Sequence, residues 1–436
     1  MRAGNRFNPR HMANTSLPAP QSLAESGLTA DLLTQLALKT LYFSGELSGG
    51  DLVRRLGLQF SVIEPVLDAL KQQYYCEVVG GGILGGSSYR YRITSQGRQI
   101  ATLYLQQDQY VGVAPVPLEQ YKTYMASLHS GGVGRVSPAD VRRALQHLVL
   151  SDKVLDEIGA AANGGHSMFI YGPPGNGKTV VAHAIRGLLT GDIAIPHAIE
   201  VEGSVVRIFD PVSHEERPVH GADSWSVDAP FDMRWALCRR PMVTAGGELS
   251  LEALELRDSK VGFYRAPLQL MANGGVLVID DFGRQRCEPH DLLNRWMVPL
   301  ESRVDFLTLR SGLKFEVPFH VFVAFATNIK PSDLVDEAFL RRVQYKVFTE
   351  NPTVDQYVRI FQNYCASRQI DADRALIESL LNGYYERHAI VPRACHPRDI
   401  VNQSLLLATY RGAPQILTPE LLDSACASYF VDDRPE

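Results

Sequence analysis

The sequence predicts an α/β fold in which a parallel sheet is sandwiched between helices, with a small α+β domain before it and a helical lid domain after it. Three observations support this fold class. Short apolar runs alternate with helical patterns in the middle of the chain, as expected of buried parallel strands. A glycine-rich loop directly follows the first run, and the pattern from Thr353 onward is wholly helical. The runs are Met168–Tyr171, Val276–Ile279 and Val321–Ala326.

The composition limits the classes of protein to consider. The chain has 436 residues, 45% hydrophobic and 21% charged, which is enough for two or three domains with a sizeable core. Its apolar runs fall far short of the roughly 18–20 residues that cross a bilayer. The first residues lack the apolar segment of a secretory signal, so we expect a cytoplasmic protein without a membrane span. The net charge of −5 gives no overall attraction to nucleic acid or anionic lipid, and six widely spaced cysteines without a C-x-x-C pair argue against a zinc ribbon or a disulfide framework.

Residues 28–105 carry the pattern of three helices followed by a β-hairpin. Thr29 is the expected N-cap of the first helix, and Ser48 and Ser61 open the second and third. Two strands joined by a glycine-rich tip follow the helices. This order resembles a winged-helix domain, a variant of the helix-turn-helix. The expected strands are Tyr75–Val79 and Tyr89–Ile93, and the tip is 80–88.

A winged helix invites a DNA-binding interpretation, because its third helix can enter the major groove. The charges do not favour this interpretation. Residues 28–110 contain seven basic and seven acidic residues, whereas contact with several phosphates requires a basic face. Arg90 and Arg92 on the second strand can meet a phosphate backbone or simply face solvent. We therefore expect a role in protein contact or packing, and we do not expect a nucleic-acid partner.

The pattern divides the chain into five segments. Prolines near the start and glycines near the end of residues 112–136 indicate a linker with one short helix inside. The polar, proline-containing first residues indicate a disordered tail. The predicted segments are a tail over 1–27, the winged-helix-like domain over 28–111, the linker over 112–136, an α/β domain over 137–350 and a helical lid over 351–436.

The glycine-rich loop reads GPPGNGKT over residues 172–179 and fits the motif G-x-x-x-x-G-K-[ST]. It lies between an apolar strand and a helical run, which is the context that this motif requires. A triphosphate needs converging backbone N–H groups, close approach of the backbone and a cation, and Thr179 can place its hydroxyl on Mg²⁺. We therefore predict an ATP site. Its expected binding residues are Gly172, Pro173, Pro174, Gly175, Asn176, Gly177, Lys178 and Thr179.

The apolar run Val276–Ile279 ends in two aspartates. Asp280 and Asp281 therefore lie at the carboxyl edge of the predicted sheet, where α/β folds bind ligands. We expect Asp280, together with Thr179, to hold Mg²⁺. We expect Asp281 to polarise the attacking water as a catalytic carboxylate. The alternative is a solvated strand end, which the neighbouring phosphate loop disfavours.

With both motifs in place, the chain resembles the AAA+ ATPases over about residues 137–430. The resemblance implies hydrolysis of Mg-ATP by a homo-oligomeric ring, most often a hexamer, that remodels a protein partner. It also implies a catalytic sensor residue after the strand Val321–Ala326, and Asn328 takes that role. Asp281 departs from the family, because most relatives carry glutamate at this position. The shorter side chain leaves the carboxylate short of the water by on the order of 1 Å, which can cost about 100-fold in rate unless the backbone compensates.

Two catalytic arginines are also implied by the resemblance. Arg341 is the first choice for an arginine finger that reaches the neighbouring subunit's nucleotide, and Arg342 is the second. Arg398 is the expected lid arginine that reaches the phosphates, and Arg393 competes with it. The alternative for each is an ordinary solvated arginine.

Two further patterns narrow the resemblance. About 100 residues separate the two motifs, and among them 244–256 resembles a helix-2 insert. A hairpin pattern over Val304–Leu309 and Leu313–Val317 resembles the pre-sensor-1 hairpin. Together these features are similar to the MoxR-type ATPases and, more distantly, to bacterial enhancer-binding activators, whose GAFTGA loop is absent. The segments 246–256 and Gly262–Tyr264 are candidate pore loops that grip substrate, with core packing as the alternative.

Two functional hypotheses follow from these features. The leading one is a ring-forming Mg-ATPase that remodels a protein client, as the MoxR-type chaperones do. The second is a nucleotide-gated regulator that binds DNA through the winged helix and hydrolyses ATP slowly or not at all.

Overall fold

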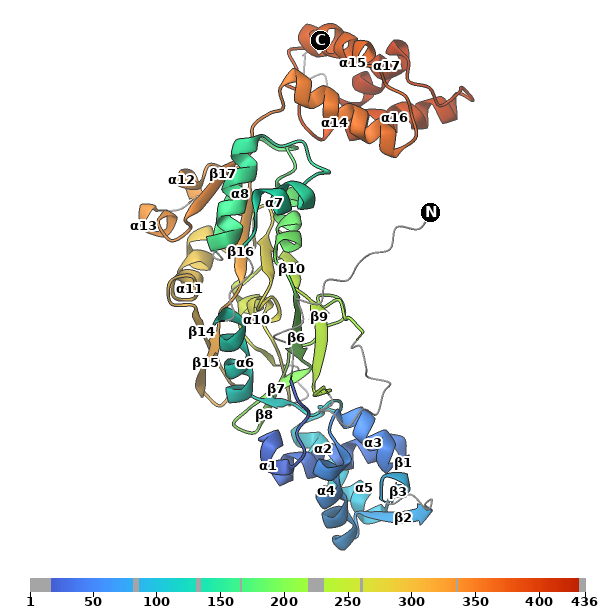
Figure 1. Ribbon diagram of the computed structural model, residues 1–436, viewed down its shortest axis with the longest axis vertical. Coiled ribbons are helices and arrows are strands. Elements are labelled where there is room, and N and C mark those ends of the chain that lie inside the picture. The colour runs from blue at the N-terminus through green and yellow to red at the C-terminus, as the bar shows by residue number, and fades with distance from the viewer. Residues whose placement is uncertain are drawn as a thin grey trace.

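The computed structural model describes residues 17–80, 86–130, 135–164, 167–218, 231–258, 262–334 and 336–430. Figure 1 shows an elongated molecule, with a helical unit at the N-terminal end, the sheets in the middle and a bundle of helices at the C-terminal end. Separate clusters of buried apolar side chains stabilise the two ends and the middle. No helix within the described ranges combines the length and the apolar character that a bilayer crossing requires.

The N-terminal unit packs helices against a three-stranded antiparallel sheet of order β1-β3-β2. Thr29 caps α2 by accepting from the Leu32 N–H at 3.3 Å, as predicted. Ser48 and Asp51 form a reciprocal capping box at α3, whereas α4 begins at Phe60 without a side-chain cap. Residues 81–85 of the predicted hairpin tip lie outside the described chain. The elements are α1 (Leu23–Ser26), α2 (Ala30–Ser44), β1 (Glu46–Ser48), α3 (Gly49–Leu56), α4 (Phe60–Gln72), β2 (Cys76–Gly80), β3 (Arg90–Ile93) and α5 (Ser95–Gln107).

The central sheet has five parallel strands in the order β10-β13-β16-β5-β17. The three predicted apolar runs form β5, β13 and β16, and their side chains are buried on both faces because helices cover both faces. The predicted α/β fold class is confirmed. The strands are β5 (Ser167–Tyr171), β10 (Met242–Ala245), β13 (Val276–Ile279), β16 (Phe322–Thr327) and β17 (Tyr345–Phe348).

Alternate residues of these strands enter two different cores. Met168 and Ile170 of β5 pack with the helices that flank the glycine-rich loop, whereas Phe169 packs with Trp296 and Phe325 in the core on the opposite face. This alternation is what the period of two in a strand dictates. The helices of this region are α7 (Pro138–Ala144), α8 (Asp152–Gly164), α9 (Lys178–Ala184), α10 (Leu268–Met271), α11 (Pro289–Ser302), α12 (Pro331–Leu334) and α13 (Glu337–Leu340).

The segment between the two predicted nucleotide motifs forms mainly strands. A second five-stranded sheet has the order β11-β12-β8-β7-β4, and β6 pairs with β9 in an antiparallel ribbon. Residues 244–256, predicted as a helix-2 insert, contain the end of β10 and only one 3-10 turn, Leu251–Leu254. The predicted hairpin is confirmed as the antiparallel pair β14 and β15. The strands are β6 (Asp192–Pro196), β7 (Ala198–Val201), β8 (Ser204–Arg207), β9 (Trp235–Arg239), β11 (Arg257–Asp258), β12 (Tyr264–Arg265), β14 (Val304–Thr308) and β15 (Lys314–Pro318).

The segment predicted as a linker, 112–136, is instead built into the core. Its strand β4 (Val116–Pro117) pairs in parallel with β7, and its helix α6 (Leu118–Ser130) buries aromatic side chains against β9. Tyr121 accepts from Asn273 Nδ2 and Tyr124 accepts from a backbone N–H, each at 2.7 Å. The sequence gives no local sign of these contacts, because the strand has only two residues and its partner is about 80 residues away. The prolines and glycines of the segment instead favour a linker.

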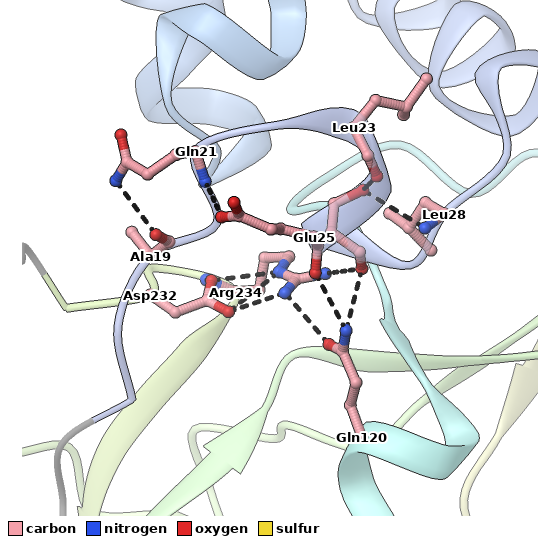
Figure 2. A network of polar contacts seen from close by, with 9 residues as sticks. Ala19, Gln21, Leu23, Glu25, Leu28, Gln120, Asp232 and Arg234 are labelled. Atoms are coloured by element: carbon pink, nitrogen blue, oxygen red, sulfur yellow. Dashed lines mark hydrogen bonds and ion pairs between the residues drawn. The ribbon is translucent and has the colours of Figure 1, made fainter.

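The last part of the predicted tail is folded against the middle of the molecule. Residues 1–16 lie outside the described chain, but the carbonyl of Leu17 accepts from the Asp232 N–H at 2.9 Å. Figure 2 shows what holds the following turn of helix. Arg234, only 2% exposed, donates to the Ser26 carbonyl at 2.9 Å, to Gln120 Oε1 at 3.2 Å and to the Asp232 carboxylate at 2.8 Å. This Arg234 network of Ser26, Gln120, Asp232 and Arg234 joins the N-terminal unit to the sheets.

The C-terminal helices form a separate bundle, as the sequence predicted. Its core contains Tyr357, Phe361 and Ile400. All six cysteines lie in described ranges and each is a free thiol. The helices are α14 (Val354–Ser367), α15 (Arg374–Leu380), which continues as a π-helical turn Leu381–Tyr385, α16 (His396–Tyr410) and α17 (Pro419–Tyr429).

Candidate nucleotide-binding site

The loop 172–179 connects β5 to α9 in a conformation that requires its glycines. Gly172, Gly175 and Gly177 have φ values of 143°, 83° and 76°, which side chains rarely adopt. A Cβ atom on Gly172 would also lie 2.3 Å from the Thr349 carbonyl oxygen. The loop is therefore shaped by its own sequence and by the end of β17, before any ligand is bound.

Lys178 is held inside this loop. Its side chain is 7% exposed, and its Nζ donates to the carbonyls of Gly172 at 3.0 Å and Pro173 at 2.7 Å. Burial lowers the pKa of Lys178, and the nearby carboxylates of Asp281 and Asp280 oppose this shift. The loop thus presents a positioned cation, which is what a polyphosphate requires.

Thr179 and Asp280 are brought together although 101 residues separate them. The Thr179 hydroxyl lies 2.9 and 3.0 Å from the two carboxylate oxygens of Asp280. The fit to Mg²⁺ is good, because hydroxyl and carboxylate oxygens are the hard ligands that this ion prefers. Both predicted metal ligands therefore lie where one ion can contact them.

Asp281 and Asn328 lie at the ends of the neighbouring strands β13 and β16. Asn328 Nδ2 is 3.4 Å from Asp281 Oδ1, and the Asp281 side chain is exposed. The predicted water-polarising carboxylate and the predicted sensor amide are therefore adjacent. Their catalytic roles stay predictions.

The helical bundle covers this edge of the sheet. A cavity of about 900 Å³ is lined by the loop, by Asp280, Asp281 and Asn328, and by lid residues that include Tyr364 and Arg398. This volume is in the usual range for a ligand site. The cavity places the predicted lid arginine beside the loop.

The lid also contacts the loop directly. The Cys395 N–H donates to the Gly175 carbonyl at 2.9 Å, and the Ala394 N–H donates to Asn176 Oδ1 at 3.2 Å. The Asn176 amide donates in turn to Asn351 Oδ1 at 2.8 Å. Sequence reasoning gave Asn176 a place in the loop but not this contact, because no local pattern links residues so far apart in the chain.

The four candidate arginines have different environments. Arg398 lines the cavity, but it is 62% exposed and pairs with Asp399 at 2.7 Å. Arg393 lies against Gly175, and its charge contributes to lowering the pKa of Lys178, so both lid candidates stay open. Near α13, Arg341 is exposed, whereas Arg342 pairs with Glu301 at 3.0 Å. Arg341 is therefore the better placed of the two to reach another subunit.

The candidate pore segments pack partly against the rest of the molecule. Phe263 lies edge-to-face on Tyr110 with ring centroids 5.7 Å apart, and the Tyr264 hydroxyl accepts from the Arg310 N–H at 3.0 Å. In the other segment Leu249 and Leu254 are buried. These contacts support the packing alternative for both segments.

Comparison with known families agrees with this geometry. Residues 124–218, which contain β5, the loop and α9, match the magnesium chelatase, subunit ChlI family, an AAA+ family. This match covers less than a quarter of the chain, whose fold is mixed α/β with a parallel sheet. Residues 353–428, which form most of the lid, match a domain of unknown function (DUF8689).

Individual proteins that are similar to the chain match different shares of its length. The uncharacterized protein YifB of Escherichia coli K12 is 46% identical over 72 residues, which are 15% of this chain and 14% of that protein. The RuvB Holliday junction branch migration motor of Thermotoga maritima is 15% identical, covers 68% of this chain and 71% of its own, and gives a TM-score of 0.36. NtrX from Brucella abortus in complex with ATP is 15% identical over 63% of this chain and 55% of its own, with a TM-score of 0.38. Scores this low assign no activity or partner to the chain.

Proposed function

We propose that the protein binds and hydrolyses Mg-ATP. The observation that carries the proposal is the contact of 2.9 Å between the Thr179 hydroxyl and Asp280, at the floor of a cavity that the lid covers. It joins the end of the phosphate loop to the end of β13. A solvated strand end does not require this pairing, whereas a shared metal ion does.

Each side chain of the site has a role in this proposal. Lys178 binds the phosphates, and a bound Mg²⁺ would neutralise part of their charge from Thr179 and Asp280. Asp281 polarises the attacking water, and the amide of Asn328 orients it. The lid contributes Arg398, with Arg393 as the alternative.

The proposal also includes an oligomeric assembly and a protein client. We propose a cytoplasmic homo-oligomeric ring, a hexamer, in which Arg341 of one subunit completes the nucleotide site of the next. The ring would remodel or activate a protein partner, as MoxR-type ATPases do. The exposure of Arg341 at the end of α13 supports this arrangement.

The N-terminal unit supplies the docking surface in this proposal. Its order of helices and strands supports a winged helix. Arg90 and Arg92 both pair with Glu46, at 2.5 and 2.9 Å, so these two cations on β3 are already partnered by a carboxylate. This pairing favours a protein contact over the alternative, a DNA-binding regulator.

The test is ATP turnover by the purified full-length protein with and without Mg²⁺, with oligomeric state measured by light scattering in the presence of ATP. We expect turnover that requires Mg²⁺ and assembly that ATP promotes. Tight ATP binding without turnover in any oligomeric state would contradict the enzymatic proposal and favour the regulator. Turnover by a monomer at its full rate would contradict only the ring.

A further inference from the structure

Asp281 has an unusual backbone conformation. Its φ is 48°, in the left-handed region that residues other than glycine rarely occupy. Aspartate tolerates this region better than most residues, but such conformations persist only where neighbouring contacts hold them. Among the described non-glycine residues with positive φ, Asp281 lines the nucleotide cavity.

Gln285 makes the contacts that hold this turn. Its Nε2 donates to the Asp280 carbonyl at 2.9 Å and to the Asp281 carbonyl at 3.2 Å. Its Oε1 accepts from the Gly283 N–H at 2.8 Å. One half-buried side chain thus bonds to the peptide groups on both sides of the left-handed residue.

The flanks of the turn are also fixed. The Asp281 N–H donates to Asp280 Oδ1 at 3.1 Å, and the Phe282 N–H donates to the Ala326 carbonyl of β16 at 2.8 Å. The Thr327 hydroxyl donates to the Phe282 carbonyl at 2.7 Å. These bonds fix the backbone around Asp281 and leave its carboxylate exposed beside Asn328.

We propose that Gln285 is a positioning residue that keeps Asp281 in the left-handed turn and so keeps its carboxylate beside Asn328. The inference rests on the proposed function, because it concerns the carboxylate that polarises water. A left-handed residue directs its side chain differently from a residue in extended or right-handed backbone.

Three variants test the inference by steady-state kinetics and by titration of a fluorescent ATP analogue. Gln285→Ala should lower kcat by about 10- to 100-fold, since a displacement of 1 Å can cost the larger factor, while KM and analogue affinity stay unchanged. Gln285→Glu keeps an oxygen that accepts from the Gly283 N–H but loses the N–H group that donates to the two carbonyls. Its kcat should therefore fall as far as that of Gln285→Ala. Gln415→Ala is the control, because Gln415 is exposed, donates to the Thr409 hydroxyl and lies outside the nucleotide site.

Two further comparisons, one with a double variant and one with a single variant, separate positioning from general loss of structure. In an Asp281→Asn background, Gln285→Ala should cost nothing further, because residues that act through one group are not additive. Asp281→Glu should not raise kcat, because the turn already places the shorter side chain. Provided that the wild type hydrolyses ATP, any of three results would overturn the inference. They are an unchanged kcat in Gln285→Ala, a further loss when Gln285→Ala is added to Asp281→Asn, and a higher kcat in Asp281→Glu. A wild type that binds ATP without turnover would contradict the proposed function and the inference with it.

Discussion

The nucleotide site and the Arg234 network are both clusters of polar side chains, and they use their hydrogen-bonding capacity differently. In the nucleotide site, Asp281 is exposed and Asp280 and Asn328 are half-buried beside a cavity. In the Arg234 network, each guanidinium nitrogen donates to a protein oxygen, and the Asp232–Arg234 pair is at most 5% exposed. The first cluster has capacity left for a ligand, whereas the second is completed by the protein itself.

The difference teaches how each cluster should respond to substitution. A buried charge is tolerated only when it is paired and hydrogen-bonded, so losing one partner destabilises the fold. A group that faces a cavity is hydrated in the free protein, so its loss should affect ligand binding or turnover more than folding. The predictions below test this contrast.

Outside the subunit's own cavity, the largest kinetic effect is expected at Arg341. Arg341→Ala should bind ATP normally and hydrolyse it about 10³-fold more slowly, if it acts as other arginine fingers do. Arg342→Ala is the control, because Arg342 is already paired with Glu301. Mixing the Arg341→Ala and Lys178→Ala proteins should restore activity at interfaces that combine an intact loop with an intact finger. No restoration, although subunits demonstrably exchange, would contradict action in trans.

The next effect is on stability and concerns the Arg234 network. Arg234→Met removes the partner of buried Asp232 and should lower the free energy of unfolding by about 3–5 kcal/mol. Affinity for ATP at a temperature where the variant is folded should be unchanged. Denaturant unfolding measures the first quantity, with Arg374→Met as a control because Arg374 lies in an exposed ion pair and should matter far less. A stable Arg234→Met protein that had lost ATP binding would contradict the structural role of the Arg234 network.

The smallest effect is expected when Arg90 and Arg92 are substituted and DNA binding is measured. Residues 28–110 have no net positive charge, and Arg90 and Arg92 share the carboxylate of Glu46. Full-length protein should therefore bind duplex DNA weakly at 150 mM salt, and the double substitution to alanine should change little. Fluorescence anisotropy checks this expectation. Sub-micromolar binding that the double substitution removes would restore the DNA-binding regulator.

These two clusters also show what the sequence could predict. The loop 172–179 and the pair Asp280–Asp281 were found because each is a local pattern that follows an apolar strand. The contact between Thr179 and Asp280 followed from the rule that parallel strands end at one edge. The Arg234 network could not be found, because it joins Ser26, Gln120 and Arg234 across 208 residues without a motif.

The same reasoning explains the errors in the fold. The predicted linker over 112–136 and tail over 1–27 were assigned from proline, glycine and polar composition, which describe the chain locally. Val116 and Tyr124 are buried by residues from β7 and β9 far along the sequence. The left-handed φ of Asp281 could not be predicted either, because it depends on hydrogen bonds with Gln285 and with the backbone of β16.

The most direct test of the account separates ATP binding from ATP turnover at the two motifs. Lys178→Ala and Asp280→Asn are compared with wild type by nucleotide titration and by phosphate release, with the half-buried Lys122→Ala and the exposed Asp355→Asn as controls outside the site. We expect Lys178→Ala to lose ATP binding, and Asp280→Asn to retain binding while losing Mg²⁺-dependent turnover. Wild-type ATP affinity in Lys178→Ala, or wild-type turnover in Asp280→Asn, would contradict the assignment of this site.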